Sequence, residues 1–129
     1  MKIARSINLN SNFVNSWVVE LDATANTCIV QNINLRQGRH FLRFDWAARV
    51  NSAFSTNGIF VILNRQPLKA IAPVDYAVHT EGLEFYINSN TATVELALCG
   101  AGTSDGVGSI VDNIDVLFEN ESVFKINVY

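Results

Sequence analysis

The sequence predicts an all-β protein, a sandwich or barrel built from about nine short strands. Apolar and polar residues alternate with a period of two along much of the chain, which is typical of strands with one buried face. No window of about 11 or more residues has a helical period. Glycine, asparagine and proline interrupt the alternating segments about every 8–12 residues, as turns between short strands do.

The clearest strand is His40–Arg49. Leu42 and Phe44 fall on one face of this segment and Arg43 and Asp45 on the other, so the first face is expected to be buried. Shorter strands are expected at Trp17–Leu21, Cys28–Ile33, Gly58–Leu63, Glu84–Ile87, Thr93–Leu98, Ile114–Phe118 and Ser122–Tyr129. Turns are expected at Asn34–Arg39, Ser55–Gly58 and Leu63–Leu68.

The composition sets limits on the function. The chain has 129 residues, enough for one β-sandwich domain spanning residues 1–129, and 49% of them are hydrophobic, enough to form a core. A net charge of −3 and scattered lysines and arginines argue against nucleic-acid binding. No apolar run approaches the roughly 18 residues of a membrane span. The first residues carry no apolar signal core, so no secretory peptide is expected there.

The two cysteines, Cys28 and Cys99, allow three interpretations. Two packed thiols are the simplest, because free cysteine behaves as a small hydrophobic residue. A single disulfide is the alternative, and it would close a loop of roughly 70 residues. A catalytic thiol is disfavoured because neither cysteine has the sequence context of a nucleophile.

A glycine-rich segment lies between two expected strands, within Ala97–Val116. Glycine adopts positive φ angles at little cost, so such a loop curls and brings carbonyl and carboxylate oxygens together. This arrangement suits a structural cation or a polar ligand at one end of a β-sandwich. The segment therefore favours binding over catalysis.

Four motifs occur in an order that resembles a known family. They are Trp17–Asp22, Ile29–Gly38, His40–Arg49 and the glycine-rich loop followed by Val111–Val116. Together they resemble the galactose-binding-domain-like jelly rolls of bacterial and plant cell-surface proteins, over about residues 13–118. The resemblance implies a jelly-roll β-sandwich of two antiparallel sheets. It also implies carbohydrate binding, a structural calcium ion and an extracellular or cell-surface location.

Acidic residues provide candidate calcium ligands, because calcium prefers carboxylate and carbonyl oxygens. Glu20 and Asp22 are expected to point away from the core at one rim, and the resemblance would bring their strand close to the closing Asp-Asn strand. The predicted metal ligands are Glu20, Asp22, Asp105 and Asp112, with Asn113 and Asp115 beside them. The alternative is that Asp105 and Asp112 cap their own turns.

Polar residues of the His40–Arg49 strand provide candidate ligand contacts. Arg43, Asp45 and Arg49 share a face and, together with Glu95, are expected to form a polar groove for sugar hydroxyls. Phe41 and Tyr86 are the aromatic candidates beneath a sugar. Phe54, at a loop tip, is expected either to contact a ligand or to fold back and cover an end of the sheet. The alternative is a ladder of charges that only solvates an exposed sheet.

Catalysis is not expected, because His40 and His79 lack metal-ligand spacing and no nucleophile-elbow motif is present. The sequence therefore predicts a non-catalytic, lectin-like carbohydrate-binding module with calcium, whose partner is a glycan or polysaccharide. The alternative is a structural module that assembles into a homo-oligomer or a larger protein through its terminal strand. A small hydrolase that uses Asp45 or Asp112 is a weaker third interpretation.

Overall fold

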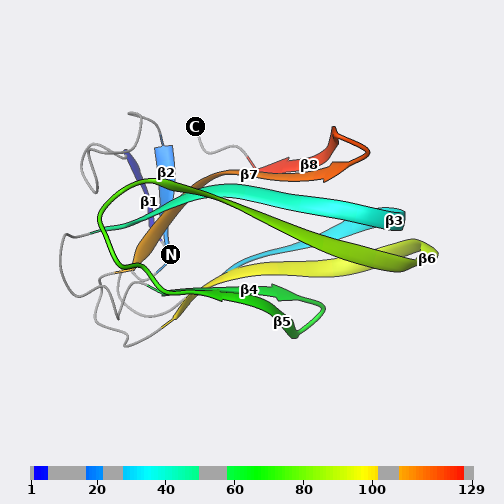
Figure 1. The fold of residues 1–129 in the computed structure, drawn as a ribbon, viewed down its shortest axis with the longest axis horizontal. Coiled ribbons are helices and arrows are strands. Elements are labelled where there is room, and N and C mark those ends of the chain that lie inside the picture. Colours follow the sequence, from blue (N-terminus) through cyan, green and yellow to red (C-terminus); the bar gives the residue numbers. More distant parts are fainter. Residues whose placement is uncertain (1, 6–16, 22–27, 50–57, 102–107, 127–129) are drawn as a thin grey trace.

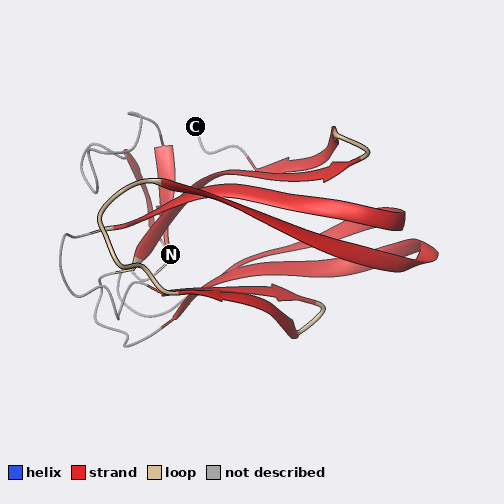
Figure 2. Ribbon diagram, viewed as in Figure 1, coloured by secondary structure: helices blue, strands red, loops and turns tan. Residues whose placement is uncertain are grey.

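The computed structural model describes residues 2–5, 17–21, 28–49, 58–101 and 108–126. Every regular element in these ranges is a β-strand (Figure 2). Within them, no helix is long and apolar enough to cross a membrane. The all-β class that the residue alternation predicts is therefore confirmed.

The strands form one continuous antiparallel sheet (Figure 1). They are β1 (Lys2–Arg5), β2 (Trp17–Glu20), β3 (Cys28–Ala48), β4 (Gly58–Leu63), β5 (Gln66–Ile71), β6 (His79–Ala101), β7 (Ser109–Phe118) and β8 (Glu121–Ile126). Their order in the sheet is β1-β2-β7-β3-β6-β4-β5, and β8 also pairs with β7.

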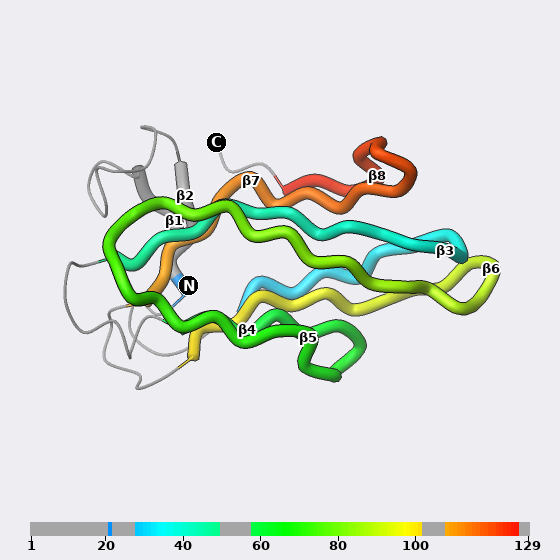
Figure 3. Tube along the Cα trace, in the orientation of Figure 1, coloured from blue at the N-terminus to red at the C-terminus, as the bar shows by residue number. Residues whose placement is uncertain are grey.

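The long strands β3 and β6 give the sheet its shape. They pair from Cys28–Cys99 at one end to Trp46–His79 at the other, with a register shift between Arg36 and Gly38. Near this shift both strands reach one end of the molecule and turn back (Figure 3). The paired ribbon is thus folded over, and each strand contributes to two layers.

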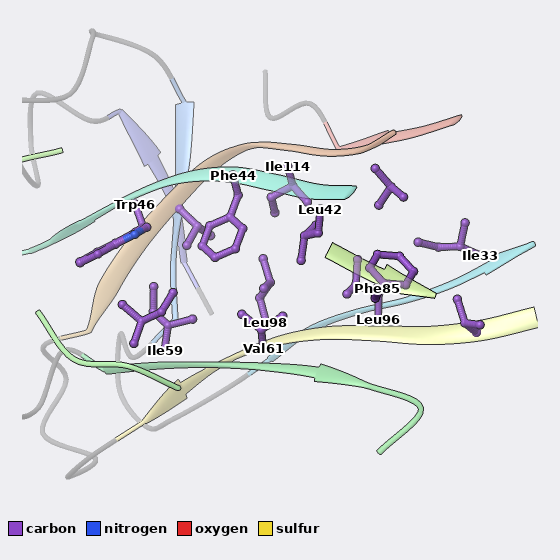
Figure 4. Packing of buried hydrophobic residues seen from close by; sticks show 14 of the residues in the cluster. Ile33, Leu42, Phe44, Trp46, Ile59, Val61, Phe85, Leu96, Leu98 and Ile114 are labelled. Atoms are coloured by element: carbon purple, nitrogen blue, oxygen red, sulfur yellow. The ribbon is translucent and has the colours of Figure 1, made fainter. Parts of the chain in front are cut away.

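The fold of this ribbon defines two layers. The β7 layer contains β7, the second half of β3 and the first half of β6, with β1, β2 and β8 beyond β7. The β4 layer contains the first half of β3, the second half of β6, and strands β4 and β5. The hydrophobic core lies between the two layers (Figure 4).

The core confirms the burial that residue alternation predicts. Leu42 and Phe44 of the β7 layer are fully buried, as is Val61 of the β4 layer. At the open edge of the sandwich, Lys69 of β5 forms an ion pair with Glu81 of β6, linking the two layers. Apolar packing holds the layers face to face, and this pair connects one edge.

Two expected turns differ in outcome. The turn at Leu63–Leu68 is confirmed, because Asn64 and Arg65 have φ angles of 50° and 63° between β4 and β5, as in a tight hairpin. The prediction of a turn at Asn34–Arg39 is wrong, because this segment stays paired within β3 and bends there. The expected strands on either side of it are halves of one strand.

The same merging occurs in β6. The expected strands Glu84–Ile87 and Thr93–Leu98 belong to a single 23-residue strand, which begins at His79. Gly58 begins β4, while the remainder of the expected Ser55–Gly58 turn lies outside the described residues. The jelly-roll sandwich is correct, but its two layers are joined through β3 and β6.

A disulfide joins Cys28 and Cys99, which are 71 residues apart in sequence. The interpretation of two packed thiols is therefore wrong. The two cysteines are register partners on neighbouring strands, a relation that sequence spacing does not reveal. The disulfide links β3 to β6 at the end of their paired ribbon that lies in the β4 layer.

Removing this disulfide is expected to lower stability. Replacing Cys28 by serine and Cys99 by alanine should reduce the free energy of unfolding by about 2–4 kcal/mol, because the unfolded chain regains the entropy of a long closed loop. Urea denaturation measures the change. A reductant should bring the wild type to the stability of the double variant and leave that variant unaffected; equal stabilities without reductant would contradict the prediction.

Candidate functional site

The candidate site is the outer face of the β7 layer, the face turned away from the core. Leu42 and Phe44 of β3 point into the core, so Arg43 and Asp45 lie on the outer face, because successive side chains point to opposite sides of a strand. The burial pattern of β3 confirms the predicted division into two faces.

Asp45 is held between two neighbouring strands. Thr80 Oγ1 of β6 donates to Asp45 Oδ1 at 2.7 Å, and Asn113 Nδ2 of β7 donates to Asp45 Oδ2 at 2.8 Å. Thr80 is the register partner of Asp45 on β6. Both carboxylate oxygens therefore have a fixed direction.

A β-bulge brings the Asn113 amide to Asp45. Between the pairs Arg43–Asp115 and Asp45–Asp112, β3 advances two residues and β7 advances three. The extra residue is accommodated at Asn113, whose φ is 53°, a conformation that asparagine tolerates better than most residues. In the sequence, the feature that corresponds to this bulge is the Asp112-Asn113 pair of the closing strand.

Arg43 belongs to a second polar group on the same face. Its Nη2 donates to Asp115 Oδ2 at 3.4 Å, and Ser122 Oγ of β8 donates to Asp115 Oδ1 at 2.5 Å. Asp115 is only 4% exposed, and buried carboxylates require such partners. Arg43 itself remains exposed to solvent.

Aromatic and charged residues alternate on this face near the bend of β3 and β6, at the end of the molecule called here the bend end. Arg39 pairs in register with Tyr86, and Phe41 with Glu84. Diagonally between these two register pairs, Arg39 Nη1 and Glu84 Oε1 form an ion pair at 3.0 Å. Phe41 and Tyr86 are both exposed large hydrophobic residues.

The structure brings together only some of the predicted ligand contacts. Arg43, Asp45 and Tyr86 share the outer face of the β7 layer. Glu95 lies after the bend of β6, in the β4 layer, so it does not join them. Arg49 is half-buried just beyond β3, and Phe54 lies outside the described residues.

The predicted metal ligands are described in part. Asp112 is 7% exposed and is the register partner of Asp45. The backbone of Glu20 pairs with Ile110, two residues before Asp112, so β2 does lie beside the closing strand. Asp22 and Asp105 lie outside the described residues. Within the described residues, no three His, Cys, Asp or Glu side chains form a group able to hold a metal.

The histidines have structural contacts that sequence reasoning missed. His79 stacks on Trp46 with ring centroids 4.7 Å apart, and its Nε2 donates to Asp75 Oδ1 at 2.7 Å. This hydrogen bond, with a second from the backbone of Ala77, lowers the pKa of Asp75. Trp46 Nε1 is buried and has no hydrogen-bond partner among the described residues.

A groove of about 670 Å³ opens where the bend of β3 approaches the turn between β7 and β8. Its lining residues are Gln37, Gly38, Arg39, His40, Phe41, Glu84, Leu117, Phe118, Glu119 and Asn120. Sequence reasoning missed this groove, because its walls come from three strands that are distant in the chain.

Comparisons with known proteins identify the fold. No protein-family model matches the chain, and no curated protein matches its sequence. A solved family 35 carbohydrate binding module from Clostridium thermocellum matches with a TM-score of 0.60 and 15% identity, over 90% of this chain and 96% of that one. A solved structure named Family 16 Carbohydrate Binding Module-2 matches with a TM-score of 0.62 and 10% identity, over 90% and 85%.

An enzyme structure also contains a similar domain. The exo-beta-1,3-galactanase from Phanerochaete chrysosporium matches with a TM-score of 0.55 and 19% identity, over 90% of this chain but 26% of the enzyme. At these identities the likeness concerns the fold. The chain therefore has the jelly-roll β-sandwich fold of these carbohydrate-binding modules, as the ordered motifs predict.

Proposed function

We propose that this protein is a non-catalytic, lectin-like carbohydrate-binding module whose ligand lies on the outer face of the β7 layer. One observation carries the proposal: Asp45 and Arg43 stand side by side on the face of a sandwich that has the fold of carbohydrate-binding modules. Tyr86 lies further along the same face, and Arg49 and Phe54 remain candidates for additional contacts.

The chemistry of Arg43 and Asp45, here called the Arg43–Asp45 row, suits sugar hydroxyls. A carboxylate has about four lone-pair sites, and an arginine has five N–H donors. Asp45 uses two of its sites for Thr80 and Asn113, which leaves acceptor capacity in a fixed direction. Such preorganisation reduces the entropy lost on binding. A hydroxyl, which both donates and accepts, can contact Asp45 and Arg43 together.

Two observations support a non-catalytic, extracellular module. The carbohydrate-binding modules are matched over 85% and 96% of their own length, whereas the galactanase is matched over 26% of its length. The Cys28–Cys99 disulfide favours an oxidising compartment, such as the cell surface or the exterior. The partner we propose is therefore a surface glycan or an extracellular polysaccharide.

Arg43 and Asp45 can be tested by substitution. Replacing either by alanine should weaken binding of the best ligand from a glycan array by about tenfold, because a hydrogen bond to a charged group contributes roughly 1.5–3 kcal/mol. Isothermal titration calorimetry measures the affinity. The matched control is Arg65→Asn, which removes an exposed charge from the β4–β5 turn. Unchanged affinity in both site variants would refute this placement of the ligand.

We also propose a structural calcium ion at the rim where β2 meets β7. Carboxylate oxygens are the ligands that calcium prefers. The pairing of Glu20 with Ile110, two residues before Asp112, supports a site that includes Glu20 and Asp112. Asp22 and Asp105 are the further candidate ligands. Bound calcium would stabilise this rim without taking part in a reaction.

Calcium binding predicts a shift in thermal unfolding. Adding calcium after treatment with a chelator should raise the unfolding midpoint by several degrees, because a ligand specific to the folded state stabilises it. Asp112→Asn should abolish the shift, whereas Asp75→Asn, a change in an exposed loop carboxylate, should leave it intact. Identical midpoints with calcium and with chelator would rule the ion out.

Assembly is a second candidate function, favoured by the position of β8. Among the described strands, β8 pairs only with β7, and an edge strand offers unpaired backbone groups to another chain. The partner would be a second copy of this chain. Light scattering over a range of concentrations should then show a dimer that Val123→Lys dissociates and Val74→Lys, in an exposed loop, does not. A constant monomer mass would exclude this function.

A further inference from the structure

The groove at the bend end has the size and the lining of a ligand site. Its volume of about 670 Å³ lies within the range of roughly 300–1,000 Å³ typical of small-molecule pockets. Its lining includes Arg39, Phe41 and Glu84 together with Glu119 and Asn120 of the β7–β8 turn. Apolar and polar groups therefore face a common space.

The base of the groove is held firmly in place. The buried His40 ring stacks between Phe85 and Phe118, with ring centroids 5.5 and 4.9 Å away. His40 Nδ1 donates to the carbonyl oxygen of Gly38 at 3.1 Å. Gly38 has a φ of 132°, and a Cβ there would lie 2.9 Å from the Phe118 ring. The bend thus requires glycine, and the groove is formed before any ligand arrives.

A second glycine positions the aromatic wall. A Cβ on Gly82 would lie only 2.5 Å from Phe41 Cζ, so the end of the Phe41 ring occupies the space that a side chain on β6 would take. The ring is nevertheless 43% exposed. It therefore rests on the backbone of β6 on one side and presents apolar surface to solvent on the other.

The groups beside Phe41 suit a sugar ring. Arg39 and Glu84 form an exposed ion pair next to it, and Asn120 is among the residues that line the groove. A pyranose has one apolar C–H face and a rim of hydroxyls. The electron-rich face of an aromatic ring attracts polarised C–H groups, while guanidinium, carboxylate and amide groups bind hydroxyls.

From these contacts we propose that the groove is a second saccharide subsite, specific for a neutral pyranose that stacks on Phe41. The Phe41 ring reaches toward Gly82, the register partner of Arg43, so this subsite adjoins the Arg43–Asp45 row. The class of ligand rests on the proposed function, but the subsite stands on different residues. A neutral ligand fits because Arg39 is already paired with Glu84, so an acidic sugar would compete with Glu84 for the guanidinium group.

Gly82→Ala provides a direct test. The added methyl group should displace the Phe41 ring, while the fold is retained, because the clash involves the far end of one flexible side chain. The probes are short neutral oligosaccharides prepared from galactan, xylan and glucan, titrated by calorimetry. Gly82→Ala and Phe41→Ala should each weaken binding by about three- to tenfold, and Phe41→Tyr should retain it.

Phe60→Ala is the matched control. Phe60 is also 43% exposed, but it lies on β4, so its loss should leave the affinity unchanged. In the Arg43→Ala background, the two groove variants should still weaken the residual binding. The amide signals of Gly38–Phe41 and Glu119–Asn120 should shift during an NMR titration of the wild type.

The outcomes separate the two proposals. Weaker binding in Gly82→Ala and Phe41→Ala, but not in Phe60→Ala, supports the subsite. If neither groove variant changes an affinity that Arg43→Ala lowers, the subsite is overturned and the proposed function stands. If the wild-type protein binds none of the oligosaccharides and none of their parent polysaccharides, both proposals are overturned.

Discussion

The pairing of β3 with β6 is the interaction on which the rest of the structure depends. It runs from Cys28–Cys99 to Trp46–His79, and both of these end pairs are held by side-chain contacts, a disulfide at one end and a ring stack at the other. Because the ribbon folds over near Gly38, its two halves face each other across the core. Strands β7 and β4 attach to different halves, so each layer takes its position from this ribbon.

Residue alternation was sufficient to predict the faces of the strands but not their continuity. Period two is a local property, and it correctly assigned Leu42 and Phe44 to the core and Arg43 and Asp45 to the surface. A bend within a paired strand and a turn between two strands have the same composition, because both require residues such as Gly38 that accept unusual backbone angles. Only the partner strand distinguishes them, and β6 lies more than forty residues further along the chain.

Because residue alternation is a local property, it predicts only some of the site residues. Arg43 and Asp45 share a strand, so their common face follows from alternation alone. The prediction that Glu95 joins them is wrong, because β6 crosses from the β7 layer to the β4 layer before it reaches that residue. Thr80, Ser122 and Gly82 matter through register with β3 and β7, which single-sequence patterns do not encode. The motif resemblance was more informative about β2, whose position beside β7 depends on long-range order.

The charges on the outer face of the β7 layer favour neutral ligands. Each of its two described exposed arginines, Arg39 and Arg43, is paired with a carboxylate, Glu84 or Asp115. Asp45 is oriented by the neutral donors of Thr80 and Asn113. A carboxylated sugar would meet the negative charges of Glu84, Asp115 and Asp45 on this face, so it would gain less from either paired arginine than from an unpaired one. Neutral hydroxyls can use the remaining donor and acceptor sites without breaking either ion pair, so this face discriminates by hydrogen-bond geometry and stacking rather than by charge.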